Sequence, residues 1–157
     1  MKPTPPGWPR ISSALFYVDP KRAIDWLCKA FGFEVRLLVE GPDGRVEHSE
    51  LDYGDGLIMV GSAGADAAKP DQDWRGLSAS PKSIGGRYTQ SLCVYVDDVD
   101  AHCAHARTAG ATICVEPKTS DYGPEYWSDR GYAAIDVEGH VWWFLQRIST
   151  RGVPDGG

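Results

Sequence analysis

Two similar units follow one another in the sequence, and this repeat limits the possible folds more than any other feature. Shifted by 78 positions, FYVDPKRAIDWLCKAFGF at residues 16–33 aligns without a gap with VYVDDVDAHCAHARTAGA at residues 94–111. A shift of 84 aligns LDYGDGLIMV at residues 51–60 with IDVEGHVWWF at residues 135–144. Identity is low, but the spacing between apolar segments and glycines is kept. We therefore expect two copies of one structural unit.

The sequence pattern of each unit predicts a strand, then a helix, then three more strands. The first strand, ISSALFYV, is apolar and β-branched in character. Asp19 stands where a helix N-cap belongs, Pro20 occupies the first helical position, and Gly32 supplies the C-terminal stop. Turns at GPDGR and YGDG separate the strands FEVRLLVE, RVEHSELDY and LIMVGS. The second unit repeats this βαβββ order, with its helix over about residues 98–109.

The repeat also divides the chain. We expect a first module with an N-terminal arm over residues 1–61 and a second module over residues 88–148. Residues 62–87 between them are rich in Ala, Ser, Gly, Pro and Asp, as expected of a linker or an exposed loop. The last residues, 149–157, predict a frayed tail.

Charge and composition exclude several classes of protein. The formal net charge of -6 argues against binding to nucleic acid or to an anionic membrane. No apolar stretch approaches the roughly 20 residues of a membrane span, and MKPTPPGWPR lacks the apolar core of a signal peptide. The four cysteines have no CxxC spacing, which favours buried free thiols over disulfides or metal ligands. We therefore expect a cytoplasmic protein.

The paired units, with AxxWLCKAFGFE in the first and DxEGHxWxF closing the second, resemble the vicinal-oxygen-chelate superfamily. This group includes glyoxalase I, bleomycin-resistance proteins, fosfomycin-resistance enzymes and extradiol dioxygenases, and the resemblance extends over residues 10–147. It implies an α+β fold in which two βαβββ modules form curled mixed sheets around a cup, with the helices outside. The fold alone does not choose among lyases, epimerases, oxygenases and noncatalytic drug binders.

The resemblance also implies where a metal would be bound. Metal-using members take one His, Gln or Glu ligand from the start of the first strand and one from the fourth strand of each unit. By the repeat, these positions are Ser12, Gln90, Met59 and Trp143. Of these four residues only Gln90 has suitable ligand chemistry, because an indole cannot ligate a divalent cation and a thioether is a poor ligand for hard metals. We therefore predict neither a metal site nor a cofactor.

The adjacent tryptophans of the fourth strand should point to opposite faces, because strand side chains alternate. Trp142 and Phe144 would pack against the helices, and Trp143 would stand in the cup.

Polar residues of the third strands are further candidates. His48 and Glu50 share a face and would point into the cup if Leu51 packs on the helix. They could act as a catalytic acid–base pair, or form a polar pair at the rim of the sheet. Arg130 and Tyr132 correspond to this pair by the repeat. They could orient an anionic or carbonyl ligand, although Arg130 could equally form a surface salt bridge.

Aromatic residues are unusually frequent outside the expected core. Trp74, Tyr122, Tyr126 and Trp127 fall in the long loops, and Phe16 and Trp143 should line the cup. Flat aromatic walls favour flat apolar or cationic ligands through stacking. The same loop residues could instead seal a dimer interface, where aromatic side chains are also enriched.

These observations lead to two hypotheses. The first is a homodimeric, metal-independent binder of small, aromatic or drug-like molecules. Its expected ligand-binding residues are Phe16, Met59, Trp74, Gln90, Trp127, Arg130, Tyr132 and Trp143. The second is an enzyme of the same superfamily, a lyase, isomerase or dioxygenase, that uses displaced metal ligands or His48 and Glu50 as catalytic residues. A purely structural or regulatory partner domain is a third possibility.

Overall fold

The computed structural model describes residues 1–42, 44–64 and 76–150 of the chain. It separates into two compact units. The first comprises Met1–Arg87 together with the turn Val137–Gly139, and the second comprises Tyr88–Asp136 and the chain from His140 onward. No helix in the described part of the chain has the length and apolar character that a membrane span requires.

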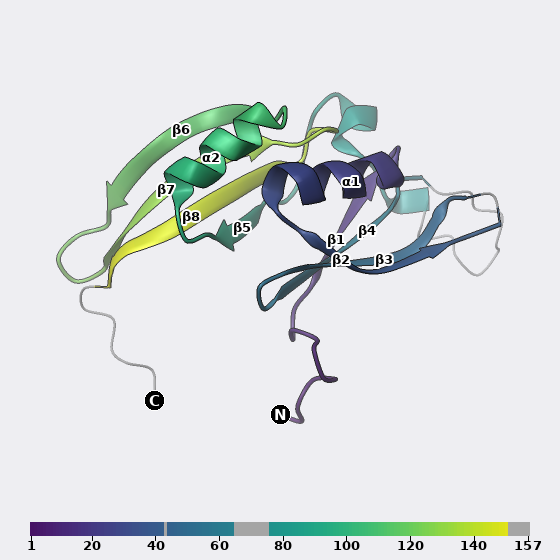
Figure 1. Ribbon diagram of the computed structural model, residues 1–157, viewed down its shortest axis with the longest axis horizontal. Coiled ribbons are helices and arrows are strands. Elements are labelled where there is room, and N and C mark those ends of the chain that lie inside the picture. Colours follow the sequence, from purple (N-terminus) through teal and green to yellow (C-terminus); the bar gives the residue numbers. More distant parts are fainter. Residues whose placement is uncertain (43, 65–75, 151–157) are drawn as a thin grey trace. The chain divides into compact units, whose positions relative to one another are not determined.

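The first unit is a mixed four-stranded sheet with one long helix (Figure 1). Its elements are β1 (Ser13–Tyr17), α1 (Pro20–Phe31), β2 (Glu34–Glu40), β3 (Val46–Tyr53) and β4 (Gly56–Ser62), followed by the 3-10 helix η2 (Pro81–Ile84). The strand order is β1-β4-β3-β2, with β1 parallel to β4 and the other neighbours antiparallel.

The sequence signals around α1 are confirmed in detail. The Asp19 carboxylate accepts a hydrogen bond from the Arg22 amide, Pro20 opens the helix, and Gly32 ends it with φ 82°. The apolar stripe of the helix is buried, namely Ala23, Ile24, Leu27, Ala30 and Phe31. This stripe covers one face of the sheet, so the other face is left for other contacts.

The second unit repeats the architecture. Its elements are β5 (Leu92–Tyr95), α2 (Val99–Thr108), β6 (Thr112–Asp121), β7 (Trp127–Ile135) and β8 (Val141–Thr150), in the strand order β5-β8-β7-β6. Helix α2 buries Val99, Cys103 and Ala106 against its own sheet. The predicted α+β fold of two βαβββ modules with mixed sheets is therefore confirmed.

The helix caps correct the alignment of the two units. Asp98, not Asp97, caps α2, because its carboxylate accepts a hydrogen bond from the Ala101 amide. From Asp19 to Asp98 the shift is 79 residues, one more than the sequence comparison gave.

The first strands follow the same corrected shift. Met59 of β4 pairs with Ala14, and its counterpart Trp143 of β8 pairs with Cys93. The second-unit counterpart of Ser12 is therefore Ser91 and not Gln90.

The turn Val137–Gly139 contributes a buried carboxylate to the first unit. Glu138 accepts hydrogen bonds from the amides of Val18 (2.7 Å) and Asp19 (2.9 Å) and from the Ser80 hydroxyl (2.6 Å). Burial acts to raise the pKa of Glu138, but these hydrogen bonds outweigh it, and the pKa lies below its ordinary value. The ionised carboxylate thus holds the entry to α1 and the start of η2 in place.

We expect Glu138→Gln to lower the free energy of unfolding at neutral pH by roughly 2 kcal/mol, because hydrogen bonds to a buried charge are lost. The folded-state pKa is lower than the unfolded one. This contribution is therefore present above about pH 4.3 and is lost as the pH falls through the folded-state pKa. Urea unfolding between pH 3 and 7 should accordingly show a shallower pH dependence in the variant. Glu125→Gln, at an exposed position, is the matched control; equal pH dependence in all three proteins would contradict this role.

Candidate functional site

One face of each sheet carries the helix, and we call the opposite face the pocket face. In the second sheet the adjacent tryptophans of β8 separate as expected. Trp142 is 0% exposed and donates its indole N–H to Asp136 (3.0 Å), whereas Trp143 is 36% exposed on the pocket face. Phe144 is fully buried and stacked with Trp142. The predicted opposite orientation of the two indoles is confirmed.

Trp143 forms part of a hollow on the pocket face of the second sheet. The hollow has a volume of about 240 Å³ and draws residues from all four strands of the sheet. Its lining consists of Cys93, Lys118, Ser120, Tyr122, Asp129, Gly131, Trp143 and Leu145. Of these, Trp143 was expected from the sequence as a ligand-binding residue, and Tyr122 was named among the aromatic residues of the loops.

Gly131 keeps the floor of this hollow open. A Cβ atom at this position would overlap Leu145 Cδ2 and would lie 3.2 Å from the Phe144 carbonyl oxygen. Leu145 pairs directly with Gly131 across β7 and β8. A glycine inside a strand often marks such a close approach, and here it leaves room for the Leu145 side chain on the floor of the hollow.

A second hollow, of about 260 Å³, lies on the pocket face of the first sheet. Backbone pairing between β3 and β4 runs only as far as Leu51 and Ile58. Beyond that point the Ser49 hydroxyl takes over, donating to the Val60 carbonyl (2.7 Å) and accepting from the Val60 amide (2.9 Å). Three predicted site residues, Phe16, His48 and Met59, line the hollow at this opening.

His48 and Glu50 form the pair expected from the sequence. Leu51 is buried on the helix side, and His48 Nε2 lies 3.0 Å from Glu50 Oε1. The His48 side chain is 42% exposed, whereas that of Glu50 is 8% exposed and also contacts Arg36 Nε at 3.3 Å. Glu50 therefore orients His48, and the imidazole is the member of the pair that a ligand can reach.

Aromatic and charged side chains form a rim beside the hollow of the second unit. The Arg147 guanidinium lies over the rings of Tyr95 (5.5 Å) and Trp127 (5.0 Å). Its hydrogen bond to buried Asp129 is the main reason that the pKa of Arg147 is raised. Tyr122 and Tyr126 contact Trp127 at ring distances of 5.8 Å and 6.1 Å. The expected aromatic cluster around Trp127 is present, while Trp74 lies outside the described residues.

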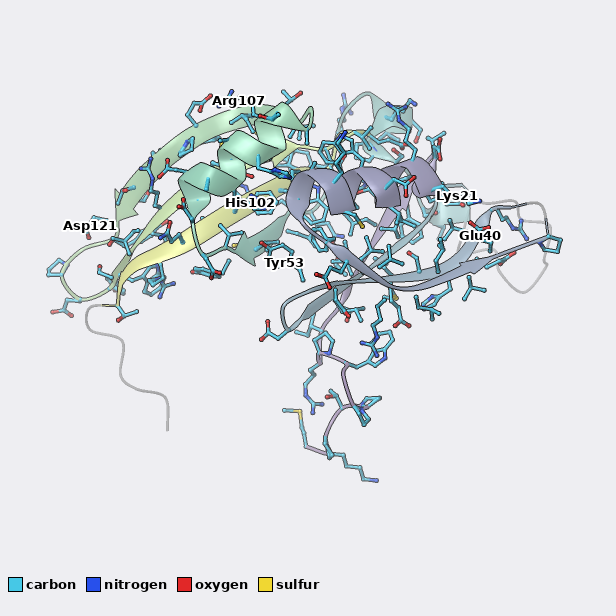
Figure 2. The ribbon with its side chains drawn as sticks, viewed as in Figure 1. Lys21, Glu40, Tyr53, His102, Arg107 and Asp121 are labelled. Atoms are coloured by element: carbon cyan, nitrogen blue, oxygen red, sulfur yellow. The ribbon has the colours of Figure 1, made fainter. Side chains whose placement is uncertain are left out.

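Arg130 and Tyr132 do share a face, but it is the helix side of the sheet, so the expectation that they enter the cup was wrong. Arg130 donates two hydrogen bonds of 2.7 Å to Asp100 of α2. Tyr132 is 0% exposed, and its hydroxyl lies 2.7 Å from Nδ1 of His102, which α2 directs toward the sheet (Figure 2).

Arg130 and Tyr132 lie on the helix side because the turn between β7 and β8 is one residue longer than the turn between β3 and β4. Leu51 pairs with Ile58, seven residues later, whereas Ala134 pairs with Trp142, eight residues later. A slip of one residue exchanges the two faces of a strand. The true counterpart of His48 is therefore Gly131.

The metal-ligand positions implied by the resemblance carry no strong ligand for a divalent cation. Gln90 lies exposed before β5, so with the corrected alignment the four positions are Ser12, Met59, Ser91 and Trp143. Within the described ranges, no three His, Cys, Asp or Glu side chains come together as a metal site. The residues present do not fit the metal centre of metal-using relatives.

Six residues that line the hollow of the second unit were not named in the sequence analysis: Cys93, Lys118, Ser120, Asp129, Gly131 and Leu145. Shifts in the pairing of β6 with β7 decide which residues of β6 face the hollow, and periodicity does not predict them. The one available signal was Gly131, a glycine inside an otherwise regular strand.

Comparisons with known proteins agree with this architecture. The description "Glyoxalase/Bleomycin resistance protein/Dioxygenase superfamily" fits residues 10–144. An uncharacterized protein of Mycobacterium bovis is 31% identical over 134 residues, which cover 85% of this chain and 80% of the relative.

Solved structures show the same fold. TioX from Micromonospora sp. ML1 superposes with a TM-score of 0.66 at 31% identity, covering 90% of this chain and 100% of TioX. TnmS3, an antibiotic binding protein from Streptomyces sp. CB03234, superposes with a TM-score of 0.59 at 19% identity, covering 87% and 93% of the two chains. At that identity the likeness concerns the fold alone.

Gly131→Ala should fill the floor of the hollow of the second unit and lower the free energy of unfolding by about 1–3 kcal/mol, because the added Cβ meets Leu145 and a backbone oxygen. Gly131→Ala/Leu145→Ala should recover part of the loss caused by Gly131→Ala. Gly76→Ala, where a Cβ meets open space, serves as the control. Thermal or urea unfolding measures the difference; an unchanged stability of Gly131→Ala would show that Leu145 does not pack closely against Gly131.

Proposed function

Because the chain belongs to the Glyoxalase/Bleomycin resistance protein/Dioxygenase superfamily, we propose that it is a metal-independent binding protein for small aromatic molecules. One observation carries the proposal. Trp143, a partly exposed indole, forms the wall of a hollow at a position where metal-using members of the superfamily carry a metal ligand.

The chemistry of the hollow supports an aromatic ligand. Trp143, Tyr122 and Leu145 offer flat and apolar surface, and an aromatic pair adds about 0.5–1.5 kcal/mol beyond the burial of area. The volume of about 240 Å³ lies just below the roughly 300–1,000 Å³ of typical ligand pockets. This size favours a planar fragment of one or two rings, or the corresponding part of a larger molecule.

The side chains at the implied metal-ligand positions support a function that does not depend on a metal. Two serine hydroxyls, a thioether and an indole stand at the four implied ligand positions, and none is a strong ligand for a divalent cation. The fold shared with TnmS3, which is named as an antibiotic binding protein, makes drug-like molecules one class of ligand to test.

A second candidate function is metal-free acid–base catalysis at the hollow of the first unit. The observation that favours it is the exposed His48 held by a buried carboxylate at 3.0 Å. In the tautomer that donates Nε2–H to Glu50, Nδ1 is the proton acceptor. It would take a proton from a carbon or hydroxyl of the substrate and return it elsewhere, as in an isomerase or a lyase.

The proposed assembly is a homodimer. Strand β2 stands at the edge of the first sheet, and four of its apolar side chains are 39–48% exposed: Val35, Leu37, Leu38 and Val39. An edge strand of this character favours association with another strand. A second copy of the chain offers the same strand in a self-complementary arrangement.

The ligand-binding proposal is tested with 2-naphthamide, a neutral aromatic probe, by quenching of tryptophan fluorescence. Trp143→Leu should weaken binding by roughly 5- to 30-fold through loss of stacking and burial, and Trp143→Phe should retain part of the affinity. Trp26→Leu, on α1 against Phe31, removes one indole that is not part of the lining of the hollow and should bind as the wild type does.

Two results would contradict the proposal. One is equal affinity of Trp143→Leu and the wild type. The other is stoichiometric zinc, nickel, iron or manganese in the purified protein, with loss of 2-naphthamide binding after a chelator is added.

The dimer is tested by sedimentation velocity. We expect the wild type at twice its chain mass of 17.2 kDa, and Leu38→Lys at least tenfold weaker in self-association, because a charge is placed on the edge strand. Ile148→Lys adds the same charge at a similarly exposed position in the second unit and is the control. A monomeric wild type at micromolar concentration would refute this assembly.

A further inference from the structure

Lys118 reaches the hollow of the second unit because of a β-bulge. The pairing of β6 with β7 shifts between Val115 and Lys118, after which Lys118 lies opposite Gly131. Glu116, two residues earlier, instead binds Arg107 of α2 at 2.7 Å and 2.9 Å. Regular alternation would place Glu116 and Lys118 on one face, and the bulge separates them.

Because Glu116 lies on the other face, it does not neutralise the positive charge of Lys118. Within the described part of the chain, the Lys118 ammonium has no carboxylate partner at salt-bridge distance. The other charged residue of the lining, Asp129, is 4% exposed and is already bound by Arg147. Tyr95 also directs its hydroxyl to the Asp129 carboxylate at 3.4 Å. The hollow and its rim therefore carry surplus positive charge.

The hollow of the first unit differs in this respect. Its lining contains Arg45, Glu47 and His48. The Arg45 guanidinium is paired with Glu47 at 2.9 Å, and His48 is held by Glu50. Positive charge there is matched by carboxylates, so the surplus belongs to the second unit although the whole chain has a net charge of -6.

We propose that the hollow of the second unit selects planar aromatic ligands that carry an anionic group, such as a carboxylate or a phenolate, and that Lys118 recognises that charge. This inference rests on the proposed function, since it concerns the hollow that contains Trp143. The ligand ring lies against the Trp143 indole and Leu145. Its anionic group points toward Lys118 and the Ser120 hydroxyl, which both line the hollow and both donate hydrogen bonds.

The experiment compares three probes that share one ring system: 2-naphthoate, neutral 2-naphthamide and cationic 2-naphthylmethylammonium. Fluorescence quenching of the 157-residue chain gives their dissociation constants. We expect 2-naphthoate to bind roughly 3- to 10-fold more tightly than 2-naphthamide, the range of a charge-assisted contact that is partly exposed to water. The cationic probe should bind most weakly.

Two substitutions of Lys118 test whether this residue causes the preference for the anionic probe. Lys118→Gln should reduce the ratio between the affinities for the anionic and neutral probes to about one. Lys118→Arg should keep the ratio. Because Lys118 is exposed, both variants should unfold at the wild-type temperature. Salt at about 0.5 M should reduce the preference of the wild type but not that of Lys118→Gln.

The outcomes separate this inference from the proposed function. Equal binding of 2-naphthoate and 2-naphthamide, with both depending on Trp143, overturns the charge selection and leaves the binding function standing. A preference for 2-naphthoate that survives in Lys118→Gln assigns the recognition to another residue and overturns the role of Lys118. Failure of all three probes to bind at millimolar concentration counts against both.

Discussion

The pairing register of β7 with β8 is the constraint on which the candidate site depends. Asp136 fixes it from the turn, because its carboxylate accepts hydrogen bonds from the His140 amide and from the buried Trp142 indole, each 3.0 Å long. With Trp142 held on the helix side, alternation leaves Trp143 only the pocket face. A slip of one residue would bury Trp143 under α2 and expose Trp142, so one buried hydrogen-bonded indole sets the character of the hollow.

The two units share a fold, but they use opposite combinations of large and small side chains on their pocket faces. In the first unit His48 projects from β3, and β4 supplies Met59 and Gly61. In the second unit the counterpart of His48 is Gly131, and the counterparts of Met59 and Gly61 are Trp143 and Leu145. Close packing leaves room for a large side chain at a pocket-face position of one strand or at the paired position of its neighbour, but not at both. One repeat therefore carries a polar hollow and the other an aromatic one.

Most of the fold could be predicted from the sequence, because its signals are local. Asp19, Pro20 and Gly32 bound α1 as expected, and alternation assigned opposite faces to Trp142 and Trp143. The site was predicted less well, because a single extra residue in a turn or a strand reverses every face beyond it. The longer turn between β7 and β8 moved Arg130 and Tyr132 to the helix side, and the bulge in β6 brought Lys118 to the pocket face, whereas Gln90 was misplaced by an alignment of the units that was one residue out of register. Neither kind of insertion changes composition or hydrophobic period enough to be seen in one sequence.

We propose that an aromatic ligand occupies the hollow beside the Trp143 indole. A crystal of the protein soaked with 6-bromo-2-naphthoate tests it most directly, because bromine is located by its anomalous scattering. We expect a single strong bromine peak between Trp143 and Leu145, with the Trp142 indole still hydrogen-bonded to Asp136. It would be contradicted by Trp143 packed under α2, or by bromine bound only beside Met59 and His48 in the first unit.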